Sequence, residues 1–207
     1  MYFFDFHHHN PKKKGIYNSH LLEENMQNFF SVGLHPMELD RIDENAIKWF
    51  REKSLHPSCL AIGECGLDHR FANQVYQEEI FTMQIEWANQ IQKPVIIHCV
   101  RLFHRLGYFK KRAKTSHIVH GFHKKASIGE NLIEMGFYLS FGKALLEDVS
   151  LQTFFKKVPH NQFFLETDNS DASIEEIYEK ASELKGIKME TLDEIVQHNL
   201  EDIQRYG

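Results

Sequence analysis

Short apolar runs alternate along this chain with longer stretches in which apolar residues recur every three or four positions. The short runs are rich in β-branched and aromatic residues, which is typical of β-strands. On this basis we predict strands over residues 1–9, 16–20, 28–34, 59–64, 94–99, 116–122, 137–141 and 162–168. Gly66 and Asp68 are expected to break the fourth strand and open a loop.

The stretches between the strands predict helices. In residues 74–92, five apolar side chains recur at the spacing of one helical face: Tyr76, Ile80, Met83, Trp87 and Ile91. A capping box formed by Ser173 and Glu176 predicts the start of another helix, which Gly186 ends. Further helices are predicted over residues 43–53, 102–114, 126–135, 145–156 and 189–204.

Strands that alternate with helices favour a mostly parallel sheet. Eight strands in 207 residues, with no repeat and no low-complexity linker, predict a single domain over residues 1–207. Many of these strands end in polar residues, and a (β/α)8 barrel gathers such ends at one mouth. We therefore predict an α/β fold of the TIM-type (β/α)8 barrel class. The alternative, a doubly wound open sheet, would not bring so many strand ends together.

The first and fourth strands carry candidate metal ligands. Glu64 ends a buried apolar strand, where a carboxylate costs desolvation energy unless a cation or a donor meets it. On this residue alone, a metal ligand and a salt-bridged glutamate are both open. His7 and His9 share one face of the first strand with Asp5, because strand side chains alternate. Two imidazoles at this spacing can both reach one metal ion.

Three later strands also deliver side chains that can bind a metal. His98 and His120 follow the apolar runs of the fifth and sixth strands, and Asp168 ends the eighth. His117 lies on the opposite face of the sixth strand, so we interpret it as structural. His123 lies just beyond that strand and is a lesser candidate.

Four imidazoles and two carboxylates form a mixed donor set that suits zinc, manganese, iron or magnesium. Six side chains exceed what one catalytic ion needs if a position stays open for water. Two divalent ions that share a bridging carboxylate fit better. Such a pair can polarise a phosphoryl or carbonyl oxygen, activate water and stabilise the leaving oxygen. Asp168 could ligate an ion and also accept the proton of the attacking water.

Six motifs stand in the order found in TatD-type metal-dependent hydrolases, which this chain resembles from Met1 almost to its C-terminus, Asn199 included. They are residues 5–9 (DFHHH), 33–36 (GLHP), 61–68 (AIGECGLD), 94–98 (PVIIH), 120–122 (HGF) and 165–168 (LETD). Each motif alone is weak, whereas six in order are highly specific. The resemblance implies a barrel of the amidohydrolase superfamily with metal-dependent phosphodiester hydrolysis, usually deoxyribonuclease activity.

The resemblance also implies a role for each candidate. One ion would be held by His7, His9, Glu64 and Asp168, and the other by Glu64, His98 and His120. Glu64 would then bridge the ions, and Asp168 would orient or deprotonate the nucleophilic water. His35 and Asp68 match positions near the substrate, and Glu166 would orient a ligand.

The chain departs from the family pattern on the substrate side. Residues 10–30 are too few for a full helix between the first two strands, so the first β-α unit is expected to be shortened. After Asp168, residues 169–173 (NSDAS) replace a Pro-rich, Arg-containing loop. Val100 replaces an arginine of the family, and Arg101, one position later, is assigned to substrate binding. The residues therefore support the chemistry more strongly than the substrate.

Composition is that of an ordinary soluble globule, with 42% hydrophobic and 26% charged residues. The net charge of -5 argues against a general nucleic-acid binder. Basic residues nevertheless follow strand ends: Lys12, Lys13, Lys14, Arg70, Arg101, Lys124, Lys125 and Lys143. A basic rim at the mouth would favour a phosphate-bearing substrate such as DNA or a small phosphodiester, although solvated loop lysines are an equally open reading.

Cys59, Cys65 and Cys99 are an odd number without a close pair, so we predict buried free thiols. No apolar run reaches membrane-spanning length and the first residues lack a signal-peptide layout, which predicts a cytoplasmic protein without a membrane partner. The leading hypothesis is a two-metal phosphodiesterase. A metal-dependent amide or lactone hydrolase and a non-catalytic metal-binding protein remain alternatives. Metal identity and oligomeric state stay open.

Overall fold

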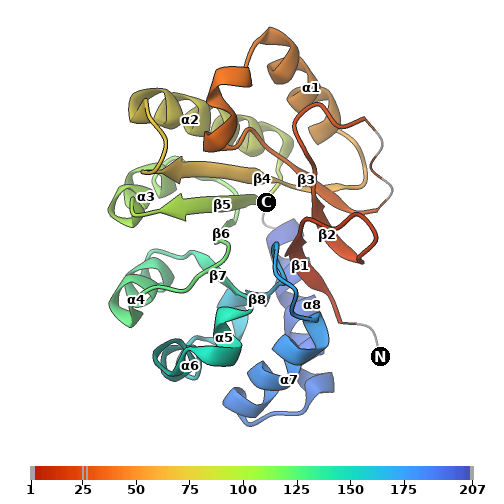
Figure 1. Cartoon of the computed structure of the whole chain (residues 1–207), viewed down its shortest axis with the longest axis vertical. Helices are drawn as coiled ribbons and strands as arrows, with labels where there is room; N and C mark the ends of the chain where they lie inside the picture. The colour runs from red at the N-terminus through yellow and green to blue at the C-terminus, as the bar shows by residue number, and fades with distance from the viewer. Residues whose placement is uncertain (1–2, 25, 27, 206–207) are drawn as a thin grey trace.

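Eight parallel strands form a barrel in the computed structural model, which describes residues 3–24, 26 and 28–205 (Figure 1). Neighbours in the sheet follow chain order from β1 to β8. The backbone of Asp168 joins the last strand to the first: its N–H donates to the carbonyl of His7 at 2.9 Å and its carbonyl accepts from the N–H of His9 at 3.4 Å. The strands are β1 (Asp5–His8), β2 (Gly15–Asn18), β3 (Phe30–Val32), β4 (Cys59–Asp68), β5 (Val95–Val100), β6 (His117–Val119), β7 (Tyr138–Phe141) and β8 (Phe163–Leu165). The predicted barrel is confirmed.

The strands differ from the predictions mainly at their ends. β1 begins at Asp5, and the predicted start over Met1 and Tyr2 lies outside the described residues. The prediction that Gly66 breaks the fourth strand is wrong, because β4 continues through Gly66 and ends at Asp68. Gly66 lets β4 approach β5: a Cβ at this position would collide with the backbone of His98. The glycine therefore serves close strand packing and not a turn.

Helices cover the outside of the barrel from β3 onward (Figure 1). The helical segments are η1 (Pro36–Arg41), α1 (Glu44–Ser54), α2 (Gln74–Ile91), α3 (Phe103–Lys110), α4 (Ala126–Glu134), α5 (Ala144–Glu147), α6 (Val149–Phe155), η2 (His160–Gln162), α7 (Ile174–Lys185) and α8 (Met189–Arg205). The helix predicted over 145–156 is in fact two, because the side chain of Asp148 accepts hydrogen bonds from the backbone of Ser150 and Leu151 and starts a new helix. The capping box of Ser173 and Glu176 is confirmed.

The first two connections of the barrel are short. Among the described residues, no helix lies between β1 and β2 or between β2 and β3, and Figure 1 shows loops there. This confirms the shortened first β-α unit and extends it to the second. Asn199 of α8 donates to the carbonyls of His160 and Phe163, at 2.8 and 2.9 Å, which fastens the last helix to β8.

A dense apolar core of the barrel and its helices positions the strand ends. Phe6 of β1 stacks on Phe164 of β8 with ring centroids 4.0 Å apart, so the closing strands are also joined by packing. Cys59, Cys65 and Cys99 are buried and free, as predicted. None of the helices in the described residues has the length and apolarity needed to span a membrane.

Candidate metal centre

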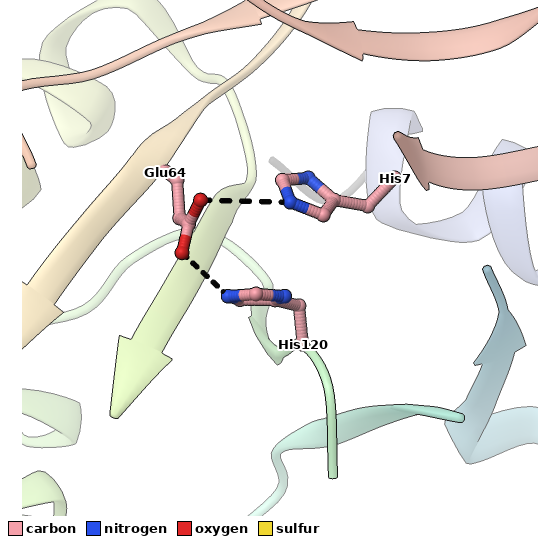
Figure 2. A group of neighbouring side chains, drawn as sticks. All are labelled: His7, Glu64 and His120. Atoms are coloured by element: carbon pink, nitrogen blue, oxygen red, sulfur yellow. Dashed lines mark hydrogen bonds and ion pairs between the residues drawn. The ribbon is translucent and has the colours of Figure 1, made fainter. Parts of the chain in front are cut away.

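The carboxylate of Glu64 lies inside the mouth of the barrel with imidazoles on both sides. Its Oε1 lies 2.7 Å from Nδ1 of His98 and 2.8 Å from Nε2 of His120. Its Oε2 lies 3.6 Å from Nε2 of both His7 and His9. Figure 2 shows the carboxylate of Glu64 pointing toward the imidazoles of His7 and His120. The two carboxylate oxygens therefore face two different pairs of imidazoles.

Local strand geometry directs Glu64 into the barrel. The pairing of β4 with β5 shifts register between Ile62 and Cys65, so Glu64 sits at an irregularity in the strand and not at its end. A Cβ at the preceding Gly63 would clash with Ile96, so only glycine permits this approach of the two backbones.

Asp168 and His35 extend the cluster at opposite ends. Oδ1 of Asp168 lies 3.3 Å from Nε2 of His9 and 3.8 Å from Nε2 of His7. The side chain is 42% exposed, so water and substrate can reach it. Nε2 of His35 lies 3.5 Å from Oε1 of Glu64, on the side of His98.

The donor set fits a metal ion. Nε2 of His7 is buried and has no hydrogen-bond partner among the described residues, yet it faces the carboxylates of Glu64 and Asp168 at 3.6 and 3.8 Å. Ligand atoms that each lie about 2 Å from one ion are roughly 3–4 Å from one another. Such spacing leaves room for a cation where a hydrogen bond is too long. Three groups have ligand atoms within 4.8 Å of one another: His7, Glu64 and His120; His7, His9 and Asp168; His35, Glu64 and His98.

Charges in the centre keep the carboxylates ionised. Burial raises the pKa of Glu64, but the imidazoles of His120, His35 and His7 outweigh it and hold this pKa well below its usual value. Burial lowers the pKa of His120, but Glu64 and Glu166 raise it well above its usual value. An ionised carboxylate surrounded by imidazoles is the form that ligates a divalent cation.

Behind the candidate ligands lies a set of side chains that orients them. Nε2 of His98 lies 2.8 Å from Oδ2 of Asp68. Arg70 donates its Nε to both oxygens of Asp68, at 3.0 and 3.1 Å. The carboxylate of Asp68 therefore lies behind His98. Glu166 accepts from the backbone N–H of Gly121 at 2.6 Å and lies 3.5 Å from Nδ1 of His120.

Sequence reasoning missed the supporting roles of two residues. Asn18, the last residue of β2, accepts from the N–H of Glu64 at 2.9 Å and donates to its Oε2 at 3.4 Å. Asp5 accepts from the N–H and the hydroxyl of Thr167, at 2.9 and 2.6 Å, and so fixes the backbone next to Asp168. Burial raises the pKa of Asp5 to about 7 despite these hydrogen bonds. The only signal for Asn18 was a polar residue at a strand end.

A cavity of about 320 Å³ opens at the mouth, and its walls carry cationic side chains. Arg70, Lys124 and Lys143 line it together with His98, His120 and Asp168. Nζ of Lys143 pairs with Asp171 at 2.8 Å, so part of its charge is already balanced.

The other predicted residues do not join the candidate ligands, although His123 lines the mouth cavity. Arg101 lines a neighbouring cavity instead. His123 is exposed, has its Nδ1 2.7 Å from the carbonyl oxygen of Gly121 and belongs to none of the three groups. His117 is buried on β6, and burial lowers its pKa to about 3, in agreement with a structural role.

Sequence comparison places the chain among known hydrolases. The model of the family described as TatD related DNase matches residues 8–205. The chain is 26% identical over 205 residues to the uncharacterized metal-dependent hydrolase YabD of Bacillus subtilis (strain 168), a match that covers 89% of this chain and 80% of that protein. It is 27% identical over 147 residues to the 3'-5' ssDNA/RNA exonuclease TatD of Edwardsiella piscicida, which covers 67% of this chain but 56% of that enzyme.

Solved structures share the fold. The crystal structure of YJJV, a TatD homologue from Escherichia coli K12, matches with a TM-score of 0.78 at 19% identity, over 94% of this chain and 87% of that chain. A TatD family hydrolase from Entamoeba histolytica matches with a TM-score of 0.76 at 16% identity, over 92% of this chain and 84% of that chain. Both likenesses agree with the barrel described above.

Proposed function

Because this chain belongs to the TatD-related DNase family of metal-dependent hydrolases, we propose that it is a two-metal phosphodiesterase that cleaves DNA or a small phosphodiester. One observation carries the proposal: the two oxygens of Glu64 face separate pairs of imidazoles. A bridging carboxylate between two ions needs this arrangement. A single ion would leave one imidazole pair beside the carboxylate without a function.

Each ion has a proposed set of ligands. His7, His9, Glu64 and Asp168 would hold one ion, and Glu64, His98 and His120 the other. Divalent ions at these positions supply Lewis-acid chemistry, which acidifies water and neutralises phosphoryl charge. The mixed nitrogen and oxygen donors admit zinc, manganese or magnesium-type ions, so the metal is left to experiment.

The chain's own residues would guide the proton and the substrate. Asp168 is held next to His9 at 3.3 Å but stays partly exposed, so its carboxylate can orient an attacking water and accept its proton. Arg70 and Lys124 on the cavity wall would attract the substrate phosphate. Asp68, which is engaged by His98 and Arg70, would act by fixing a ligand and not by touching substrate.

The test is hydrolysis by one preparation in two states, chelated and metal-restored. The substrates are bis-p-nitrophenyl phosphate and a labelled single-stranded oligonucleotide. We expect the chelated protein to be inactive and a divalent ion to restore cleavage of both. Bound metal is counted in parallel. No cleavage of either substrate with two ions bound per chain would contradict the phosphodiesterase, and an amide and lactone screen would then follow.

A further inference from the structure

A second cavity lies beside the metal centre, between the neighbouring helices α3 and α4 of the outer layer (Figure 1). Its volume is about 700 Å³, within the usual range of small-molecule sites. Apolar side chains from both helices line it: Phe103, Ile128, Leu132 and Met135. Gly107 of α3 also lines the cavity, close to Met135: a Cβ at Gly107 would lie 3.1 Å from Sδ of Met135.

Two cations join this cavity to the metal centre. Lys124 lines both cavities, and Arg101, on the turn after β5, lines the larger one. Whereas Arg70 and Lys143 are paired with carboxylates, neither Arg101 nor Lys124 has a carboxylate partner in the part of the chain that the structure describes. Burial lowers the pKa of Lys124, and the charges of Arg101 and Arg70 lower it further, so Lys124 lies within electrostatic range of both arginines. Unbalanced positive charge between two cavities attracts an anionic group.

We infer that the cavity between α3 and α4 receives the nucleobase next to the scissile phosphodiester, while the flanking phosphate contacts Arg101 and Lys124. The inference rests on the proposed function and names the part of the substrate that lies outside the metal centre. The lining, which also includes Glu134 and His104, offers cations to an anionic group and apolar side chains to a flat ring, and a nucleotide carries both a phosphate and an aromatic base. The ring of Phe103 offers a stacking surface that accepts any base, because every base has a π-face. The side chain of Asn131, also on the lining, can hydrogen-bond to a base edge.

The experiment compares an intact single-stranded oligonucleotide with one that lacks the base beside the cleaved phosphodiester. For metal-restored wild type, kcat/KM should be about tenfold higher for the intact strand, because stacking of one base on an aromatic side chain improves binding by about this factor. Binding of both labelled strands is also measured in chelator by fluorescence anisotropy, where we expect a similar preference. Two variants act on the cavity: Phe103→Ala removes the stacking ring, and Met135→Trp fills the space from a position that is already 39% exposed.

Matched controls lie outside the cavity. Tyr108→Ala removes an exposed aromatic from the same helix as Phe103, and Val149→Trp adds an indole at an exposed position of α6. The cavity variants should lose the preference for the intact strand. The controls should keep the preference.

Equal cleavage and equal binding of the two strands by wild type would overturn the inference, and so would cavity variants that retain the preference. If no strand is cleaved but base-dependent binding in chelator disappears in Phe103→Ala and Met135→Trp, the inference stands and the proposed phosphodiesterase fails. Absence of both cleavage and base-dependent binding would reject both.

Discussion

Replacing Glu64 by glutamine tests the centre at the side chain that contacts both imidazole pairs. Oε1 lies 2.7 and 2.8 Å from His98 and His120, and Oε2 lies 3.6 Å from His7 and His9. Glutamine has the same shape as glutamate, but its NH₂ group is a donor and cannot bind a metal ion. The ion beside one imidazole pair would therefore lose a ligand, and the centre would lose a negative charge. Loss of a group that merely orients a ligand costs 10–100-fold. Loss of a ligand shared by two ions should therefore cost at least about 10³-fold in hydrolysis.

Stability should change much less than activity. The depressed pKa of Glu64 means that its ionisation stabilises the fold above the pKa of the unfolded chain, and that this contribution disappears as pH falls through the lower folded value. The cost of burying the charge is already included in this lowered pKa, and glutamine, which cannot ionise, loses the remaining gain. At pH 7, we expect the chelated variant to unfold within about 2 kcal/mol of the chelated wild type.

The assay measures metal content, hydrolysis of bis-p-nitrophenyl phosphate and chelated thermal unfolding on the same samples. Glu179→Gln, an exposed change on α7, is the control for removal of one carboxylate. We expect fewer than one ion per chain in Glu64→Gln and wild-type metal content in the control. A folded Glu64→Gln protein that keeps two ions and full activity would refute the bridging role.

Three further outcomes follow from the geometry. Asp68→Asn removes the carboxylate behind His98 and should weaken metal binding about 10–100-fold in a competition titration; unchanged affinity would contradict its orienting role. His117 is buried with its pKa lowered to about 3, so the free energy of unfolding should fall as the pH drops from 6.5 to 3. His117→Leu should reduce this pH dependence by up to about 1.4 kcal/mol per pH unit, measured by urea titration of chelated protein. A pH dependence equal to that of wild type would contradict this. Gly66→Ala should lower the free energy of unfolding by at least about 3 kcal/mol in the same titrations, because the added Cβ would collide with the backbone of His98. A decrease below about 1 kcal/mol would show that the backbone of β5 can move aside.

The barrel and the candidate ligands were predictable because they depend on local patterns. Strand alternation places His7 and His9 on one face whatever the rest of the chain does, and parallel strands bring their ends to one mouth. Once the fold class followed from the alternation of strands and helices, Glu64 and Asp168 had to approach each other. The structure joins them through the shared neighbour His9, at 3.6 and 3.3 Å.

The supporting residues were not predictable because their partners are remote in sequence. Asn18 bonds to a residue 46 positions away, and Asp5 to one 162 positions away. The end of β4 was misjudged for a related reason. Gly66 has the local properties of a turn residue, but its function is to admit the neighbouring backbone of β5, which only the register of the sheet reveals.

The same distinction between local and remote partners explains how the substrate side can change while the metal centre stays intact. Residues 169–173 stand where the family resemblance leads us to expect an Arg-containing loop, and they contain no basic residue. Arg70 and Lys124 line the mouth of the barrel, and Arg101 lines the adjoining cavity. Arg101 and Lys124 are neither candidate ligands nor carboxylate-bound neighbours of one, so their positions can vary without a cost to metal binding. Substrate selection in this chain should therefore respond to changes around α3 and α4 more than to changes in residues 169–173.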